Sequence, residues 1–227
     1  MPQQLGFDLP QLTAYQRSDF LPAASNAMAL TLIEGWQSWP SHKLLLCGPK
    51  GSGKTHLAHI WADLSGANIV SAPSLSETDI PQLAQGCVGI ENVHLIADDD
   101  AAQTALFHLH NLVLAEGYSL LMTGRGLPKE WGLSLPDLES RIGGTQVARL
   151  EAPDDALLAA VLAKLFADRQ LRPKVDVIPY LIARIHRSFA AAQVTVAALD
   201  AMALEEKRPI TRQLAARVLD NLEKNEP

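Results

Sequence analysis

The sequence predicts an α/β protein in which a parallel sheet with crossover helices is followed by a small all-helical domain. Short apolar runs alternate with segments of helical period over residues 21–151, which is the pattern of a parallel sheet covered on both faces. From residue 152 onward only helical periodicity remains. Because 48% of the 227 residues are hydrophobic, the chain can bury a sizeable core.

The strands and helices of the α/β domain are predicted from two sequence patterns. A short continuous apolar run such as KLLLC at 43–47 is typical of a buried strand, and apolar residues spaced by three and four are typical of a helix. The predicted strands are 43–47, 68–71, 86–91, 118–123 and 146–150, and the predicted helices are 23–36, 53–65 and 101–116.

The remainder of the chain predicts a helical domain and an N-terminal arm. Thr211 is a suitable N-cap for the last helix, and Pro209 helps to end the helix before it. Residues 1–20 carry two prolines and show no clear period, so we expect an extended arm. The expected parts are the arm 1–20, the α/β domain 21–151 and the helical lid 152–227, whose helices are 154–170, 177–186, 190–206 and 211–224.

Charge and composition exclude several classes of protein. The net charge of −6 argues against a protein that holds nucleic acid by covering its phosphates with cations, so any DNA contact is expected to be weak or indirect. The apolar stretches are short and no cleavable leader is recognisable, so we expect no membrane segment and a cytoplasmic location. Cys47 and Cys87 lie in apolar runs and are interpreted as core side chains.

The segment GPKGSGKT at 48–55 matches the phosphate-binding pattern GxxxxGK[ST] and lies between a predicted strand and a predicted helix. Its glycines allow successive N–H groups to converge on phosphate oxygens, and the following helix adds its positive end. Lys54 should reach the β- and γ-phosphates, and the Thr55 hydroxyl should bind Mg²⁺. The predicted nucleotide-binding residues are Gly48, Pro49, Lys50, Gly51, Ser52, Gly53, Lys54 and Thr55.

A second feature of such a site is an apolar strand that ends in acidic residues. Here the segment is VGIENVH, which makes Glu91 the candidate for holding Mg²⁺ through water. Asn92 follows, and an amide cannot act as the base for an attacking water. We therefore expect nucleotide binding with weak intrinsic hydrolysis. The run 98–100 is interpreted as an acidic helix start.

The order of these segments resembles the AAA+ domain of DnaA, and most closely the Hda type of DnaA regulator. The resemblance rests on GPKGSGKTHLAH, VGIENVHLI, LLMTGRGLP and LPDLESRIGG. It implies that the chain binds ATP or ADP with Mg²⁺ and that Thr123 is the sensor I residue. It also implies that Arg141 is an arginine finger, which would act in trans on nucleotide held by a neighbouring subunit.

Two positions depart from the family pattern. The sensor II arginine of the lid falls on Ala190 in HRSFAAAQ, and Arg187 is the candidate substitute about one turn earlier. Glu91 stands where the family usually has aspartate. The resemblance therefore does not imply the usual arginine contact from the lid to the nucleotide.

The arm carries the sequence QLGFDL at 4–9, which resembles the peptide by which Hda proteins bind the sliding clamp of the replicative polymerase. The side chains expected to fill the clamp pocket are those of Gln4, Leu5, Phe7 and Leu9.

The resemblance implies a bacterial regulator, associated with the nucleoid or replisome, that promotes hydrolysis of DnaA-bound ATP and so restrains replication initiation. Its expected partners are DnaA and the clamp, and a homo-oligomer stays open. Two other functions share these motifs. One is an autonomous ATPase such as a helicase loader, which Asn92 argues against. The other is a nucleotide-gated adaptor of DnaA or the clamp that stimulates no hydrolysis.

Overall fold

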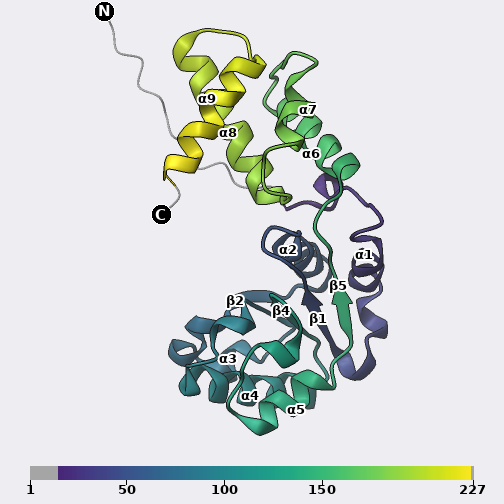
Figure 1. Cartoon of the computed structure of the whole chain (residues 1–227). Coiled ribbons are helices and arrows are strands. Elements are labelled where there is room, and N and C mark those ends of the chain that lie inside the picture. The colour runs from purple at the N-terminus through teal and green to yellow at the C-terminus, as the bar shows by residue number, and fades with distance from the viewer. Residues whose placement is uncertain (1–14, 226–227) are drawn as a thin grey trace, which may run out of the picture.

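The structure is a computed structural model that describes residues 15–225 of the chain (Figure 1). It consists of a sheet covered by helices and a separate group of helices near the C-terminus, as the sequence predicts. The four arm residues proposed to contact the clamp lie outside the described residues.

Five parallel strands form the sheet in the order β2-β3-β4-β1-β5. All five predicted strands are present, each within two residues of its expected start. Leu46 of the central strand is in register with Thr123, and Cys47 with Gly124. The strands are β1 (Lys43–Cys47), β2 (Asn68–Ser71), β3 (Val88–Glu91), β4 (Leu120–Gly124) and β5 (Val147–Arg149).

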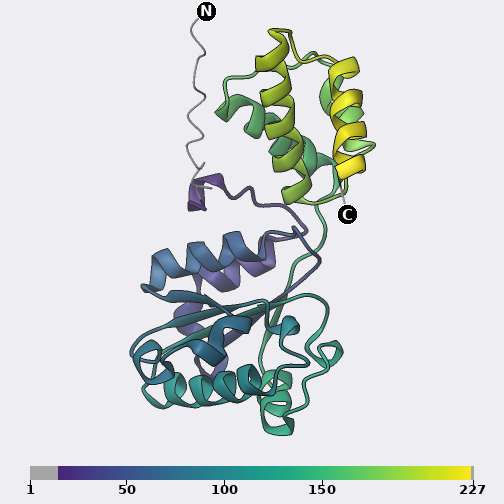
Figure 2. The same cartoon turned by 90° about the vertical axis from the view of Figure 1, so that its left-hand side faces the viewer.

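Helices cover both faces of the sheet (Figures 1 and 2). Successive strand residues point to opposite faces, so Leu44 and Leu46 join the core under α1 (Ala27–Glu34) and α2 (Lys54–Ser65). Leu45 and Cys47 join the opposite core. That core lies under α3 (Ile80–Leu83), α4 (Asp100–Ala115) and α5 (Pro136–Gly143).

The helices beyond the sheet share a third core of their own. Three of them begin at side-chain caps. Asp154 accepts a hydrogen bond from the Leu157 amide at 2.7 Å, and Ser188 accepts one from the Ala191 amide at 3.1 Å. Thr211 caps the last helix, as predicted. The lid helices are α6 (Asp155–Asp168), α7 (Val177–Ile182), α8 (Phe189–Glu206) and α9 (Arg212–Asn225). Within residues 15–225, no helix is both long and apolar enough to span a membrane.

Some predicted bounds were wrong. The helix expected from residue 23 begins at Ala27, because the buried Asn26 side chain bonds the Ala23 amide and the Leu21 carbonyl and holds that segment as a turn. The helix expected over 177–186 ends at Ile182. Helices α3 and α5 were not predicted. Short 3-10 turns also were not: η1 (Arg17–Asp19), η2 (Trp36–Ser38), η3 (Pro40–His42), η4 (Ala72–Glu77), η5 (Val93–Leu95) and η6 (Pro128–Glu130).

Candidate phosphate-binding site

The GPKGSGKT loop joins the carboxyl end of β1 to the first turn of α2, as the sequence predicts. Gly51 and Gly53 both have positive φ, 73° and 98°, a conformation that side chains disfavour. At Gly48 an added Cβ would lie 2.6 Å from the Leu150 carbonyl oxygen. All three glycines are therefore required by the path of the backbone.

Two polar side chains of this loop, those of Ser52 and Lys54, are buried. The Lys54 ammonium donates hydrogen bonds to the carbonyls of Gly48 at 2.8 Å and Pro49 at 2.7 Å. Burial, followed by repulsion from Arg125, lowers the pKa of Lys54 to about 8. The Ser52 hydroxyl is buried without a hydrogen-bond partner among the described residues. Because an unpaired buried hydroxyl is costly, this arrangement suits an anion that accepts hydrogen bonds in the loop.

The acidic strand end lies at the same edge of the sheet. Glu91 is the last residue of β3, and its charge is one of the influences that raise the pKa of Lys54. Asn92 follows with a φ of 62°, and its backbone N–H donates a hydrogen bond to the hydroxyl of Thr123 at 3.3 Å. Thr123 itself is buried in β4, beside β1. The structure thus brings the predicted sensor residue and the predicted magnesium residue to the loop.

The oxygen donors of this edge fit Mg²⁺. Thr55 in the first turn of α2 offers a hydroxyl, and Glu91 offers a carboxylate, which are the hard ligands that the ion prefers. Within residues 15–225, no group of three or more His, Cys, Asp or Glu side chains could hold a metal. The ion would therefore need phosphate oxygens to complete its coordination.

The first turn of α8 packs directly on the phosphate-binding loop. The Phe189 amide donates to the Gly51 carbonyl at 2.9 Å. Ala190, the position of the missing sensor II arginine, lies 3.5 Å from where a Cβ on Gly51 would stand. Arg187 instead forms an exposed ion pair with Asp155 at 2.8 Å. The lid thus reaches the loop through backbone and small side chains, with its candidate arginine engaged elsewhere.

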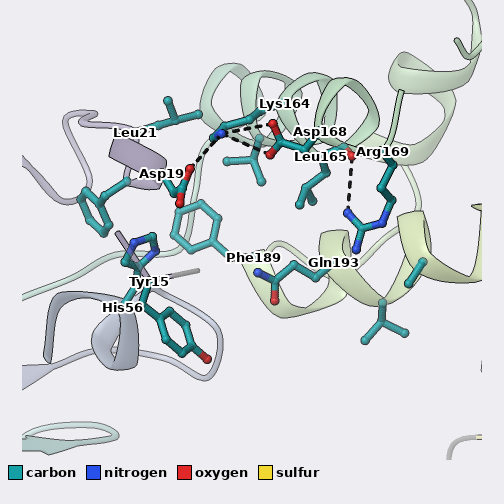
Figure 3. A pocket seen from close by; sticks show the side chains of 14 residues that line it. Tyr15, Asp19, Leu21, His56, Lys164, Leu165, Asp168, Arg169, Phe189 and Gln193 are labelled. Atoms are coloured by element: carbon teal, nitrogen blue, oxygen red, sulfur yellow. Dashed lines mark hydrogen bonds and ion pairs between the residues drawn. The ribbon is translucent and has the colours of Figure 1, made fainter. Parts of the chain in front are cut away.

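A cavity of about 700 Å³ opens beside the loop (Figure 3). This volume is in the range of small-molecule sites, roughly 300–1,000 Å³. Its walls come from the segment before α1, from α2, from α6 and from α8. Two of its lining residues, Phe20 and Phe189, also lie near the loop, with ring atoms 3.5 Å and 3.3 Å from where a Cβ on Gly53 would stand. On the α6 wall of the cavity, the Lys164 ammonium forms ion pairs with Asp19 at 3.0 Å and with Asp168 at 3.1 Å.

The segment before α1 is attached to α2 by aromatic and polar contacts. Tyr15 stacks on His59 with ring centroids 4.5 Å apart. His56 Nε2 donates to the Gln16 carbonyl at 3.0 Å. Burial lowers the pKa of His56, so the ring is neutral near pH 7. The two histidines of α2 therefore hold this segment through a hydrogen bond and a ring contact.

Arg141 lies apart from the other predicted site residues. It is exposed on α5, with its guanidinium carbon 5.2 Å from the centre of the Phe107 ring. Its carbonyl accepts hydrogen bonds from the Lys43 ammonium at 3.0 Å and the Thr145 hydroxyl at 2.9 Å. Since Lys43 begins β1, Arg141 lies at the edge of the sheet opposite the phosphate-binding loop.

Sequence reasoning missed two residues at the loop, Arg125 and His94. Both share the electrostatic environment of Lys54: the Arg125 charge lowers the pKa of Lys54, and after burial the charges of Arg125 and Lys54 lower the pKa of His94. Arg125 stands in the quoted segment LLMTGRGLP, and His94 in VGIENVHLI. Each lies just after the end of a predicted strand, and this position in the sequence was the signal that could have marked them as candidate site residues.

No protein-family model matches the sequence. Among solved structures, the chain is similar to domain III of the replication initiation protein DnaA from Thermotoga maritima, with a TM-score of 0.80 and 17% identity over 94% of this chain and 98% of that one. AMPPCP-bound DnaA from Aquifex aeolicus gives 0.70 and 16%, over 84% and 66% of the two chains. A RuvB variant from Thermotoga maritima gives 0.65 and 19%, over 86% and 66%. The chain therefore has the α/β P-loop NTPase fold of the AAA+ type, with a helical C-terminal region.

Proposed function

We propose that this chain is a DnaA-related protein that binds ATP or ADP with Mg²⁺ at residues 48–55. The observation that carries the proposal is the glycine loop between β1 and α2, which encloses the Lys54 ammonium and the unpaired Ser52 hydroxyl. The adjoining cavity has room for a base and sugar. The likeness to an AMPPCP-bound DnaA supports the same ligand class.

The proposed activity is stimulation of ATP hydrolysis on DnaA, in the manner of Hda proteins. Arg141 supports it, because the side chain is exposed and stands at the opposite edge of the sheet from the loop of its own chain. An arginine in that place suits nucleotide held by another subunit, where its guanidinium would stabilise the charge of the transition state. Asn92 supports a weak activity of the isolated chain, since an amide cannot serve as base.

The decisive experiment follows phosphate release from ATP-loaded DnaA in the presence of DNA-loaded clamp and this protein. The wild-type chain should stimulate release. Arg141→Ala should lower that stimulation by roughly a hundredfold or more, while its own nucleotide binding is retained. Arg208→Ala is the matched control, because it removes an exposed arginine of the lid and should leave stimulation unchanged.

The other outcomes discriminate between the three functions. Appreciable ATP turnover by the isolated chain would favour an autonomous ATPase. Full stimulation by Arg141→Ala would argue against the arginine finger. If wild-type protein binds DnaA or the clamp without stimulating phosphate release, the adaptor function is favoured.

We further propose that residues 4–9 tether the protein to the sliding clamp. The double variant Gln4→Ala and Phe7→Ala should lose clamp binding in a surface-immobilised assay and keep nucleotide binding. Equal clamp binding by the variant and the wild-type chain would remove the tether from the proposal.

A further inference from the structure

Three residues from distant parts of the sequence follow neighbouring strands at the phosphate-binding edge of the sheet. Strands β3, β4 and β1 are parallel neighbours, so their carboxyl ends share one edge. His94 follows β3, Arg125 follows β4, and Lys54 begins the helix that follows β1. The order of the strands alone therefore brings the three together.

Arg125 is held at this edge by its backbone. The Gly48 amide donates to the Gly124 carbonyl at 3.4 Å, which extends the pairing of β1 and β4 to the first residue of the loop. The Trp131 indole donates to the Arg125 carbonyl at 2.5 Å and covers Gly124 so closely that a Cβ there would lie 2.2 Å from the ring. The backbone of Arg125 is thus fixed beside the loop, while its side chain is exposed.

The electrostatics of the edge point to an anion. The Arg125 charge lies near enough to lower the pKa of Lys54, after burial has done so. Burial, then the charges of Arg125 and Lys54, lower the pKa of His94. A neutral imidazole has one donor and one acceptor nitrogen. Both ring nitrogens of His94 are buried without a hydrogen-bond partner among the described residues. A phosphate group would offset the paired positive charges and accept the imidazole N–H.

Neither lid position considered for sensor II brings a cation to the phosphate-binding loop. The first turn of α8 presents Ala190 toward Gly51, and the Arg187 guanidinium is paired with Asp155. Positive charge beside the end of a polyphosphate, beyond Lys54, can instead come from the sheet. Arg125 of the sheet is placed to provide it.

We propose that Arg125 and His94 bind the terminal phosphate of a nucleoside triphosphate from the sheet side, and so make the site favour triphosphate over diphosphate. The inference rests on the proposed nucleotide site and goes beyond it by naming which side chains distinguish the two ligands. Arg125 supplies a charged donor pair, which suits phosphate oxygens. His94 supplies a neutral hydrogen bond.

The test is calorimetric titration of the full chain with AMPPNP and with ADP, each with Mg²⁺. Arg125→Gln should weaken AMPPNP binding at least about tenfold, because it removes a charge-assisted hydrogen bond, and should change ADP binding less than about threefold. His94→Phe keeps a ring of similar size and should weaken AMPPNP binding in the same selective manner, by a smaller factor. Arg149→Gln is the matched control: it removes an equal charge from the end of β5, on the other side of β1, and should leave both affinities unchanged.

The outcomes separate this inference from the nucleotide site itself. Equal weakening of both ligands by Arg125→Gln, or no weakening of either, would overturn the role of Arg125 while the nucleotide site stands. Wild-type protein that binds neither ligand would overturn the site and the inference together. Thermal melts without nucleotide should be unchanged for Arg125→Gln, since the side chain is exposed.

Discussion

Raising the pH from about 7 to about 9 is expected to weaken nucleotide binding roughly tenfold, because Lys54 loses its proton over that interval. Burial and the neighbouring Arg125 lower the pKa of this ammonium to about 8. Bound phosphate would favour the charged form and raise that pKa, so binding takes up a proton above about pH 8. With a pKa of about 8, roughly nine-tenths of the free protein is protonated at pH 7 and roughly one-tenth at pH 9.

The measurement is the calorimetric affinity for ADP with Mg²⁺ across this range, repeated in two buffers of different ionisation enthalpy to count protons. Lys54→Arg is the control, because a guanidinium stays charged throughout and should give a weaker but pH-independent affinity. Arg125→Gln should shift the fall in affinity to higher pH, because it removes a charge that lowers the pKa of Lys54. A wild-type affinity that is constant to pH 9, or a Lys54→Arg affinity that falls equally, would refute the reasoning.

Three further predictions concern stability and can be checked by denaturant unfolding. Gly51→Ala should lower the free energy of unfolding by about 2 kcal/mol or more, because φ is positive there and the added Cβ would lie 2.5 Å from the Ser188 Cβ. Gly117→Ala is the control: φ is also positive, but no atom lies within 4 Å, so the loss should be about 1 kcal/mol. Gln103→Leu should cost roughly 3 kcal/mol, since this buried amide bonds four backbone groups of two loops. The free energy of unfolding of the wild-type chain should fall by up to roughly 3 kcal/mol as the pH drops from 6.5 to 4. Burial and the Lys43 charge lower the pKa of His110 from 6.5 to about 4. The unfolded chain therefore takes up the proton at a higher pH than the folded chain does. His110→Gln should flatten that profile.

Local patterns in the sequence predicted most of the elements. The run at 43–47 and the glycine loop after it could be recognised because their signals lie within a few consecutive residues. Helix α5 was missed because its eight residues carry only two buried side chains, Leu138 and Ile142. The turns over 72–83 depend on contacts with α4 that no local period encodes.

The candidate site was predicted in part. Thr55, Glu91 and Thr123 belong to recognisable segments, and the structure places these segments at one edge of the sheet. Arg125 and His94 could not be assigned, because their proximity depends on the strand order β3-β4-β1 rather than on their sequence neighbours. Strand order is a property of the whole chain, so a motif search along the sequence does not reach it.

The short segment before α1 has a mechanical consequence. The Tyr15 ring stacks on His59 of α2, and Asp19 forms an ion pair with Lys164 of α6. A force applied from the N-terminal side would therefore reach both walls of the cavity before it reached the sheet. Tension from that side would act first on the Asp19–Lys164 ion pair, which joins this segment to the lid.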